Sequence, residues 1–382
     1  MATNYINQSG TDLSFAYTAY TTGTKAKTSG YKTSTGSDLS DLFAKYVDYK
    51  GENSGYLDLS GNDLSTLYQG LRFSNMSTGA NNKINSVSAY DLSHVFVGGA
   101  FTRIDDISAN YIAMWNGTSW SEISNNFNGL VAGIYAYDLS HIYVCGQFSN
   151  APYYHIAMYN SINSTWSQLG SGTTSQIVSI YVYDLSHVYV GGSFTTIGGI
   201  NANYIAMWSE YSSSWSALGN GTGGSIITVH GFDLSHVYVS GNFTSVYAGT
   251  VGANYIARWN HINSAWSPLG SGLASAPNSM YALKENCVYA GISQCWLYNG
   301  SSWTGISGTN PYALYAVDSS NVYIGGDKLY FYNGITTTAF SQNTNDYVTS
   351  ISPINKLNIF VGGQFTSVGG DTRCSRIVKF RN

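Results

Sequence analysis

The stretch Asp184-Leu185-Ser186-His187-Val188-Tyr189-Val190-Gly191-Gly192 is one copy of a segment that recurs along the chain. It begins with an acidic residue and a short polar turn, continues as a run of β-branched and aromatic residues, and ends in two glycines. The other copies lie at Asp91–Gly99, Asp138–Gly146, Asp233–Gly241, 286–291, 321–326 and 359–363. Repetition at such a period is typical of folds that use one small structural unit many times.

Each unit of this repeat contains four strand signals. In the unit around Asp184 they are Ile177–Tyr183, His187–Gly191, Tyr204–Trp208 and a fourth strand that begins near Trp215. An Asp side chain accepts hydrogen bonds from backbone N–H groups two or three residues further on, so Asp-Leu-Ser-His predicts a tight turn between the first two strands. Seven units, spaced about 34–51 residues apart, predict an all-β fold, namely a seven-bladed β-propeller of four-stranded antiparallel blades.

The sequence also predicts how the ring closes. The seventh unit ends at Arg376–Phe380, which is typical of a third strand with no fourth strand behind it. Upstream of the first unit, Phe73–Gly79 matches the fourth-strand segment Trp166–Gly172 of a later unit, and both begin 18 residues before the acidic residue of the next turn. We therefore predict that a strand at about residues 71–79 completes the last blade, so that the propeller spans residues 71–382. Such closure protects the sheet edges at the seam.

The repeat resembles that of kelch-type propellers. Kelch repeats carry a glycine pair after the second strand, followed by an aromatic residue and a tryptophan about seven residues apart; here the matching residues are Gly191-Gly192, Trp208 and Trp215. The resemblance implies the propeller fold. Kelch-like repeats occur in adaptors, lectin-like proteins and a few oxidases, so the resemblance does not fix the function.

The first seventy residues carry a different repeat. Each copy has a tyrosine, a glycine, an Asp-Leu-Ser triplet and a closing aromatic residue, and the period is 25–26 residues. Units this short bury little surface alone and need neighbours or a partner. We predict a repetitive N-terminal arm over residues 1–70. The residues expected to dock it are Tyr5, Leu13, Tyr31, Leu39, Phe43, Tyr56, Leu64 and Tyr68.

These arm copies resemble the tandem Gly-x-Asp-Leu-Ser/Asn repeats near the starts of structural proteins from tailed phages and large DNA viruses. The resemblance implies that the arm anchors the protein to a particle through contacts with other particle proteins, and that the propeller projects outward. A flexible linker with degenerate repeats is the alternative.

The composition excludes several classes of function. Only 9% of the residues are charged, and the net charge of −4 removes the electrostatic basis for binding nucleic acid. No apolar run approaches the roughly 18 residues that span a bilayer, so membrane insertion is not expected. The start of the chain lacks the basic and apolar regions of a secretion signal. Four cysteines without metal-ligand spacing favour free buried thiols, with a Cys287–Cys295 pair as the alternative.

Catalytic, cofactor and metal sites find little support in the sequence. Four histidines occupy equivalent turn positions, namely His94, His141, His187 and His236. Equivalent residues of adjacent blades lie too far apart to share one metal ion, so we interpret these histidines as parts of the turns. No segment proposes a carboxylate pair for sugar hydrolysis or a copper site. We predict no enzyme, no cofactor, and no catalytic or metal-binding residue.

The loops after the second strands vary between copies while the strands repeat. In propellers, such loops share a face with the blade-to-blade connections, and ligands usually bind there. Variation on one face is typical of recognition by successive repeats, and tyrosine rings suit stacking on sugars or anchoring a protein contact. The residues predicted to contact a ligand are Arg103, Asp105, Asp106, Tyr153, Tyr154 and Tyr247. Loop drift without a ligand is the alternative.

These observations together favour a non-enzymatic protein at the surface of a virion or similar particle, synthesised without a signal peptide. We expect its propeller to mediate attachment to a host glycan or receptor, or assembly, by multivalent contact. One alternative is a cytoplasmic kelch-type adaptor, which needs a second protein-binding domain. Another is a carbohydrate-active or copper oxidase propeller enzyme, which needs a carboxylate or metal cluster.

Overall fold

The computed structural model describes residues 72–123, 127–246, 249–355 and 358–381, and these contain strands but no helix. The predicted arm residues and Tyr247 lie outside the described residues.

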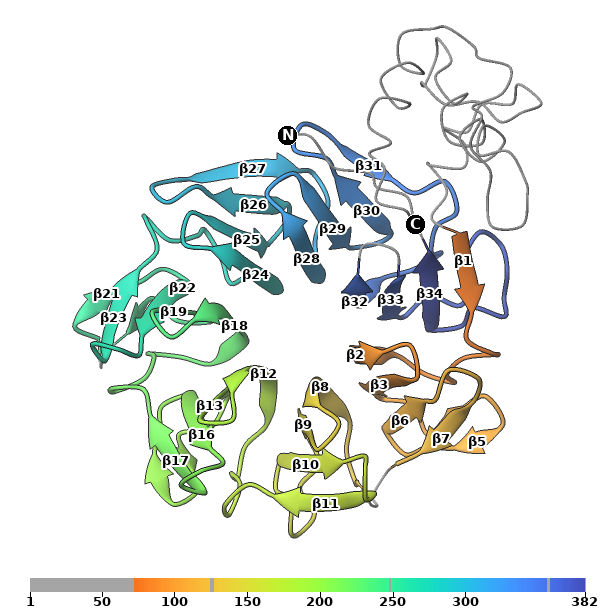
Figure 1. Cartoon of the computed structure of the whole chain (residues 1–382). Coiled ribbons are helices and arrows are strands. Elements are labelled where there is room, and N and C mark those ends of the chain that lie inside the picture. The colour runs from red at the N-terminus through yellow and green to blue at the C-terminus, as the bar shows by residue number, and fades with distance from the viewer. Residues whose placement is uncertain (1–71, 124–126, 247–248, 356–357, 382) are drawn as a thin grey trace, which may run out of the picture. The chain divides into compact units, whose positions relative to one another are not determined.

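Seven four-stranded sheets are arranged around a common axis, which confirms the predicted seven-bladed propeller (Figure 1). In each blade the first strand is the innermost, and every pairing between neighbouring strands of a blade is antiparallel. Blade 1 consists of β2 (Ile84–Asp91), β3 (His94–Gly99), β6 (Ile112–Trp115) and β7 (Trp120–Glu122). Blade 2 consists of β8 (Val131–Asp138), β9 (His141–Gly146), β10 (Ile156–Asn160) and β11 (Thr165–Gln168).

The next four blades follow the same order. Blade 3 consists of β12 (Ile177–Asp184), β13 (His187–Gly192), β16 (Ile205–Ser209) and β17 (Ser214–Ala217). Blade 4 consists of β18 (Ile226–Asp233), β19 (His236–Gly241), β22 (Ile256–Asn260) and β23 (Ala265–Pro268). Blade 5 consists of β24 (Ser279–Lys284), β25 (Cys287–Gly291), β26 (Cys295–Tyr298) and β27 (Trp303–Ser307). Blade 6 consists of β28 (Ala313–Asp318), β29 (Asn321–Gly325), β30 (Leu329–Tyr332) and β31 (Thr337–Ala339).

Blade 7 joins the two ends of the described chain. It consists of β32 (Val348–Asn355), β33 (Asn358–Gly363), β34 (Ile377–Arg381) and β1 (Arg72–Asn75). The N-terminal strand β1 pairs antiparallel with β34, so that Phe73 lies opposite Phe380. This pairing confirms the predicted closure, in which a strand from before the first unit supplies the outer strand of the last blade.

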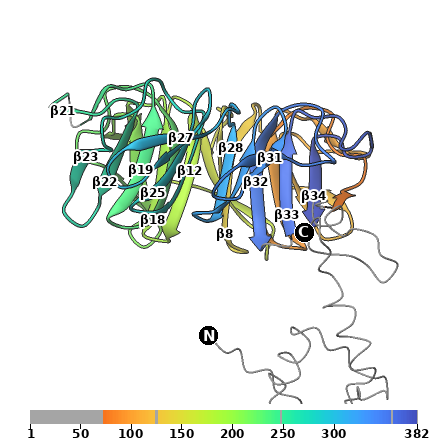
Figure 2. The same ribbon diagram turned by 90° about the horizontal axis from the view of Figure 1, so that it is seen from above.

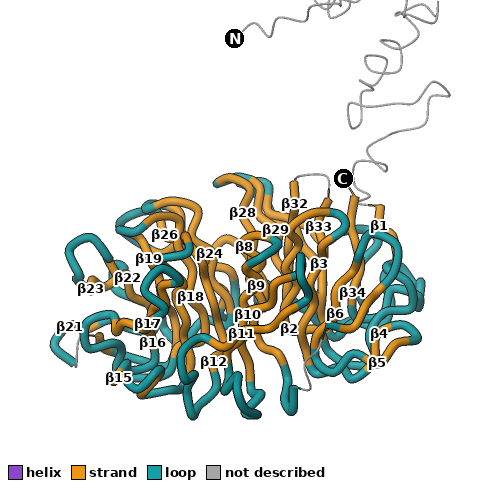
Figure 3. The backbone as a smooth tube through the Cα atoms, turned by 60° about the horizontal axis from the view of Figure 1, so that its bottom comes forward, coloured by secondary structure: helices purple, strands orange, loops and turns teal. Residues whose placement is uncertain are grey.

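The strands run between two faces of the ring (Figure 2). We call the edge with the second-to-third-strand loops and the blade-to-blade connections the loop face, and the opposite edge the turn face. Short hairpins that the sequence did not predict extend three of the loops, and Figure 3 shows β5, β15 and β21 along one edge. The hairpins are β4 (Arg103–Ile104) with β5 (Ile107–Ser108), β14 (Thr196–Ile197) with β15 (Ile200–Asn201), and β20 (Ser245–Val246) with β21 (Val251–Gly252).

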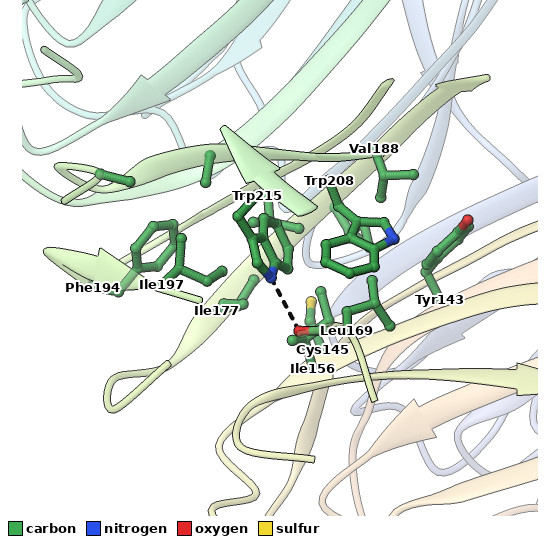
Figure 4. Packing of buried hydrophobic residues seen from close by; sticks show 14 of the residues in the cluster. Tyr143, Cys145, Ile156, Leu169, Ile177, Val188, Phe194, Ile197, Trp208 and Trp215 are labelled. Carbon is green, nitrogen blue, oxygen red and sulfur yellow. Dashed lines mark hydrogen bonds between the residues drawn. The ribbon is translucent and has the colours of Figure 1, made fainter. Parts of the chain in front are cut away.

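A tryptophan on the outer strand joins each of several blades to the blade before it. In blade 3, Trp208 and Trp215 lie opposite each other with ring centroids 5.2 Å apart. The Trp215 indole N–H also donates to the Leu169 carbonyl of the preceding connection at 3.0 Å (Figure 4). The same bond recurs as Trp120 to Met76, Trp166 to Ile123, Trp266 to Leu218 and Trp303 to Leu269. We call these five bonds the tryptophan latches.

The second glycine of each Gly-Gly pair allows close contact between backbones. A Cβ atom added at Gly192 would lie 2.2 Å from the Gln176 carbonyl oxygen, and one at Gly99 would lie 2.1 Å from that of Lys83. Any side chain there would push the second strand away from the segment that leads into the first strand of the same blade. The recurring glycine is therefore required by packing.

We expect Trp215→Phe to destabilise the propeller by about 1–3 kcal/mol, because the substitution removes the donor of a buried hydrogen bond as well as part of a packed ring. Chemical denaturation monitored by fluorescence or circular dichroism measures this loss. Trp296→Phe is the matched control, since Trp296 is partly buried and its side chain makes no hydrogen bond within the described residues. Equal losses in the two variants would show that the latch contributes nothing beyond ring packing.

Candidate functional site

A small pocket of about 240 Å³ lies on the loop face between blades 2 and 3. Its walls come from the loop that holds Tyr154, the connection Ser171–Thr174, and the β14 turn Thr196–Gly199. Tyr154 is 41% exposed, whereas the rest of the wall consists mainly of hydroxyl side chains and glycine backbone. An exposed aromatic ring beside hydroxyl and backbone polar groups is suited to a small polyhydroxyl ligand or an extended peptide.

Hydrogen bonds fix the two sides of this pocket. The Thr173 N–H donates to the Tyr154 carbonyl at 3.1 Å, and the Thr173 hydroxyl donates to the Thr196 carbonyl at 2.8 Å. The Gly198 N–H donates to the Gly172 carbonyl at 2.8 Å. A Cβ atom at Gly198 would lie 2.3 Å from the Trp215 ring, so the latch tryptophan packs directly against this wall. The pocket therefore rests on the same residues that join blades 2 and 3.

Tyr154 stands where the neighbouring blades have asparagine. The Asn203 carbonyl of blade 3 and the Asn254 carbonyl of blade 4 accept the N–H bonds that match the one at Tyr154. The side-chain amides of those two asparagines donate to backbone carbonyls of the connection to the next blade. The acceptors are the carbonyls of Asn220 and Ser271. A tyrosine has no amide to make this bond, so its ring is left on the loop face.

The other predicted ligand contacts lie elsewhere. Arg103 and Asp106 are exposed on the β4–β5 hairpin of blade 1, and neither lines the Tyr154 pocket. Asp105 accepts hydrogen bonds from the Ser77 hydroxyl at 2.6 Å and the Thr78 hydroxyl at 2.7 Å. These bonds hold the pKa of its carboxyl group below the usual value. Asp105 thus joins the blade 1 hairpin to the segment that follows β1.

Tyr153 requires a correction. It is only 7% exposed, and its ring packs edge-on against Phe127 and beside Trp166. A ring used in this way is not available to stack on a ligand, so Tyr153 is a packing residue of blade 2. Its neighbour in sequence, Tyr154, holds the exposed position. The sequence offered two adjacent tyrosines and no periodic signal that separates the buried ring from the exposed one.

The four repeated histidines belong to the turns, as the sequence indicated. In each copy the Nδ1 atom of the histidine lies 2.7–2.9 Å from a carboxylate oxygen of the aspartate three residues earlier. The aspartate also accepts backbone N–H bonds, for example from Ser186 to Asp184 at 2.7 Å. In blade 6 the amide of Asn321 makes the same contact with Asp318 at 2.9 Å. In these five turns the side chain three residues after the aspartate therefore bonds to its carboxylate, whereas the blade 5 turn from Lys284 to Cys287 lacks the pair.

Within the described ranges, no group of three or more His, Cys, Asp or Glu side chains is arranged to hold a metal ion. The cysteines Cys145, Cys287, Cys295 and Cys374 are all buried free thiols. Burial raises the pKa of the Cys145 thiol to about 12. Residues 72–382, where described, also include no helix able to span a membrane.

Five aromatic side chains form an arc around part of the propeller axis, and the sequence analysis did not identify this arc. The rings lie on successive innermost strands, three residues before the last residue of each strand: Tyr135, Tyr181, His230, Tyr281 and Tyr315. Successive ring centroids are 6.0, 5.3, 4.4 and 5.1 Å apart. Blades 7 and 1 have Ser352 and Ser88 at this position. We call the five rings the inner aromatic arc.

Some side chains at this position, and some at the position two residues earlier, accept hydrogen bonds from backbone N–H groups. These N–H groups belong to the innermost strand of the next blade. The Ser352 hydroxyl accepts the Ala89 N–H at 2.9 Å, and the Ser88 hydroxyl accepts the Ala136 N–H at 2.9 Å. In the aromatic arc, His230 Nδ1 accepts the Ala282 N–H at 3.2 Å. His230 must therefore be neutral, with its proton on Nε2. Burial lowers the pKa of His230 to about 4.

Comparisons with known proteins place the chain among propellers. A family model described as the Rax2 C-terminal β-propeller domain matches residues 167–319, which run from blade 2 into blade 6. No curated protein sequence matches the chain.

Solved structures share the fold at low sequence identity. The extracellular domain of BT4673 from B. thetaiotaomicron, described in one structure as a one-component system, gives a TM-score of 0.58 at 14% identity, over 81% of this chain and 40% of that chain. YCF48 bound to a D1 peptide gives a TM-score of 0.56 at 12% identity, over 81% of this chain and 96% of that chain. This chain spans only about two fifths of the length of the BT4673 domain. Likeness at these identities shows the fold alone.

The stability of the propeller should fall below neutral pH because of His230. Its pKa is lowered from 6.5 to about 4 on folding, so its contribution is complete above pH 6.5 and is lost as the pH falls toward 4. The loss amounts to at most about 3 kcal/mol. Denaturant unfolding of wild type and His230→Gln between pH 7 and pH 4 measures it. The variant is expected to have the shallower dependence, and identical slopes would contradict the assignment.

Proposed function

We propose that the protein is a non-enzymatic binding protein of the surface or an appendage of a virus-like particle. Its propeller attaches to a glycan or protein ligand through the loop face, and its N-terminal arm docks to other particle proteins. The Tyr154 pocket is the observation that supports ligand binding. It combines an exposed ring with hydroxyl groups at a place where the repeat is broken.

The chemistry of that pocket favours a polyhydroxyl ligand. The Tyr154 ring supplies an apolar face for a sugar ring, and the hydroxyls of Ser171 and Thr174 supply donors and acceptors. None of the described residues that line the pocket is charged, so recognition there rests on stacking and neutral hydrogen bonds. A neutral glycan is therefore the first ligand to test, and a peptide strand is the second.

The particle role rests on the arm. Its three copies resemble repeats of phage and large-virus structural proteins, and a unit of 25–26 residues needs a partner to bury its apolar residues. A propeller tethered in several copies on one particle would bind a host surface more tightly than a single copy, because each further contact is intramolecular.

We expect Tyr154→Ala to weaken glycan binding about 5–30-fold, which corresponds to losing about 1–2 kcal/mol of ring contact. A glycan array followed by titration of the best neutral ligand measures this. Tyr211→Ala is the matched control, because Tyr211 is 81% exposed on the third-to-fourth-strand turn of blade 3, at the opposite face. Binding that is lost equally in both variants, or in neither, would remove the Tyr154 pocket as the site.

A second test removes residues 1–70 and leaves β1 in place. The shortened chain should keep the melting temperature of the propeller, because every strand of the seven blades is retained. It should lose its place in the larger assembly, which size-exclusion chromatography with light scattering detects. A full-length chain that remains monomeric in the presence of the particle proteins would argue against the docking role.

A further inference from the structure

A larger pocket, of about 650 Å³, lies between blades 4 and 5. It is bounded by Arg258 on β22, by Ser267–Leu269 at the end of β23, and by the two turns of blade 5 at 284–286 and 299–300. Both of those turns belong to the turn face, so this pocket is separate from the Tyr154 pocket on the loop face. Its volume falls in the range of about 300–1,000 Å³ that small-molecule sites usually occupy.

One position of the third-to-fourth-strand turn bears on how far the space between two blades is filled. The residue two places after the third-strand aromatic is Glu210 in blade 3 and His261 in blade 4, whereas it is glycine in blades 1, 5 and 6 (Gly117, Gly300 and Gly334). Glu210 fills its interface by accepting hydrogen bonds from the Tyr143 hydroxyl at 3.0 Å and the Trp208 indole at 2.9 Å. Similarly, the His261 ring lies 4.6 Å from that of His187. A glycine has no side chain to occupy the same space.

One buried hydroxyl at the interface of blades 4 and 5 has no partner within the described residues. Tyr238 is fully buried on β19, directly opposite Arg258 of β22, and its hydroxyl makes no hydrogen bond within the described residues. Among the equivalent tyrosines, the Tyr143 hydroxyl donates to Glu210 and the Tyr289 hydroxyl to the Ser319 carbonyl, whereas the Tyr189 hydroxyl is also unpaired. Burial raises the pKa of Tyr238, so its hydroxyl remains protonated and able to donate. A buried polar group left unpaired is costly unless a ligand satisfies it.

The charges around the pocket define what fits there. Arg258 and Lys284 line it as cations, and Glu285 lines it as an anion, which leaves one net positive charge in a chain of net charge −4. Glu285 already accepts from Arg258 at 3.2 Å and lies 3.5 Å from His236 Nε2. The remaining lining includes the amides Asn286 and Asn299 and the apolar groups Pro268, Leu269 and Tyr298.

We propose that this pocket binds a hydroxylated monocarboxylate, of the class of acidic sugars. One carboxylate matches the single unbalanced positive charge. It can bond to Lys284 on the pocket wall and, by displacing the side chains that cover it, to the buried Tyr238 hydroxyl. The amides and Glu285 bind hydroxyl groups, while Tyr298 and Pro268 pack against the apolar face of the sugar ring. The inference does not depend on ligand binding at the loop face.

Titration of the full-length protein with glucuronate, followed by calorimetry or ligand-observed NMR, tests the proposal, with glucose as the neutral probe. Wild type is expected to bind glucuronate at least tenfold more tightly than glucose. Tyr238→Phe removes only the hydroxyl and should weaken glucuronate binding about tenfold. Lys284→Gln should weaken glucuronate binding about fivefold or more and leave glucose binding unchanged.

Two matched variants serve as controls. Tyr189→Phe removes another buried, unpaired hydroxyl at the interface where His261 occupies the equivalent place, and it should leave glucuronate binding unchanged. Lys328→Gln removes an exposed positive charge of blade 6.

Equal binding of the two sugars, no binding of glucuronate, or equal effects of the test and control variants would overturn the proposal. Where Tyr238→Phe unfolds, Lys284→Gln decides, since Lys284 is exposed. Tyr154→Ala should leave glucuronate binding intact, which separates this site from the proposed glycan site.

Discussion

The bond from an outer-strand tryptophan to the carbonyl of the preceding connection is the contact on which the ring depends. Each blade is a small sheet with little core of its own, and it becomes stable only when its faces pack against both neighbours. A latch such as Trp215 to Leu169 joins the outermost strand of one blade to the point where the chain leaves the previous one. It therefore fixes both the distance and the rotation between blades. The bond from Trp120 to Met76 does the same across the seam, because Met76 follows the N-terminal strand.

The innermost strand of each of the seven blades has one unpaired edge, and this edge is a second constraint on the fold. Water or side chains must satisfy those N–H groups, because each is the free edge of a sheet. Near the seam, serines on β32 and β2 accept them directly, as Ser350 does for Val87. Along blades 2 to 6 the aromatic arc lies against these edges, and Ser179 of blade 3 also accepts the Val229 N–H of blade 4. Gly231 shows the close packing that results, since a Cβ atom there would lie 3.0 Å from the Tyr181 ring. His230 combines both solutions, because its ring stacks and its nitrogen accepts.

Much of this architecture is readable from the sequence, because the repeat encodes it in contacts between near neighbours in the chain. The Asp184 turn, the Trp208–Trp215 pair and the closing strand at Phe73 each follow from fixed spacings within one unit. The inner aromatic arc also has a fixed position, three residues before the end of each innermost strand, so an alignment of the seven units would have found it. Burial of Tyr153 and exposure of Tyr154 could not be predicted in that way. Blade 2 has a shortened loop there, and the repeat offers no template for it.

The candidate sites arise where the repeat is broken, and a pattern-based prediction is weakest at such places. A residue that recurs in every blade, such as the turn histidine, is explained by the blade itself. Tyr154 replaces an asparagine that bonds to its own backbone connection, and the freed surface becomes a pocket. Gly300 stands where blades 3 and 4 have side chains that fill the equivalent space, and the Tyr238 hydroxyl of that interface is unpaired. In both cases the residue differs from those of the neighbouring blades 3 and 4, and a bound ligand would supply the missing contacts. The departures from the repeat are therefore the positions at which mutation should separate binding from folding.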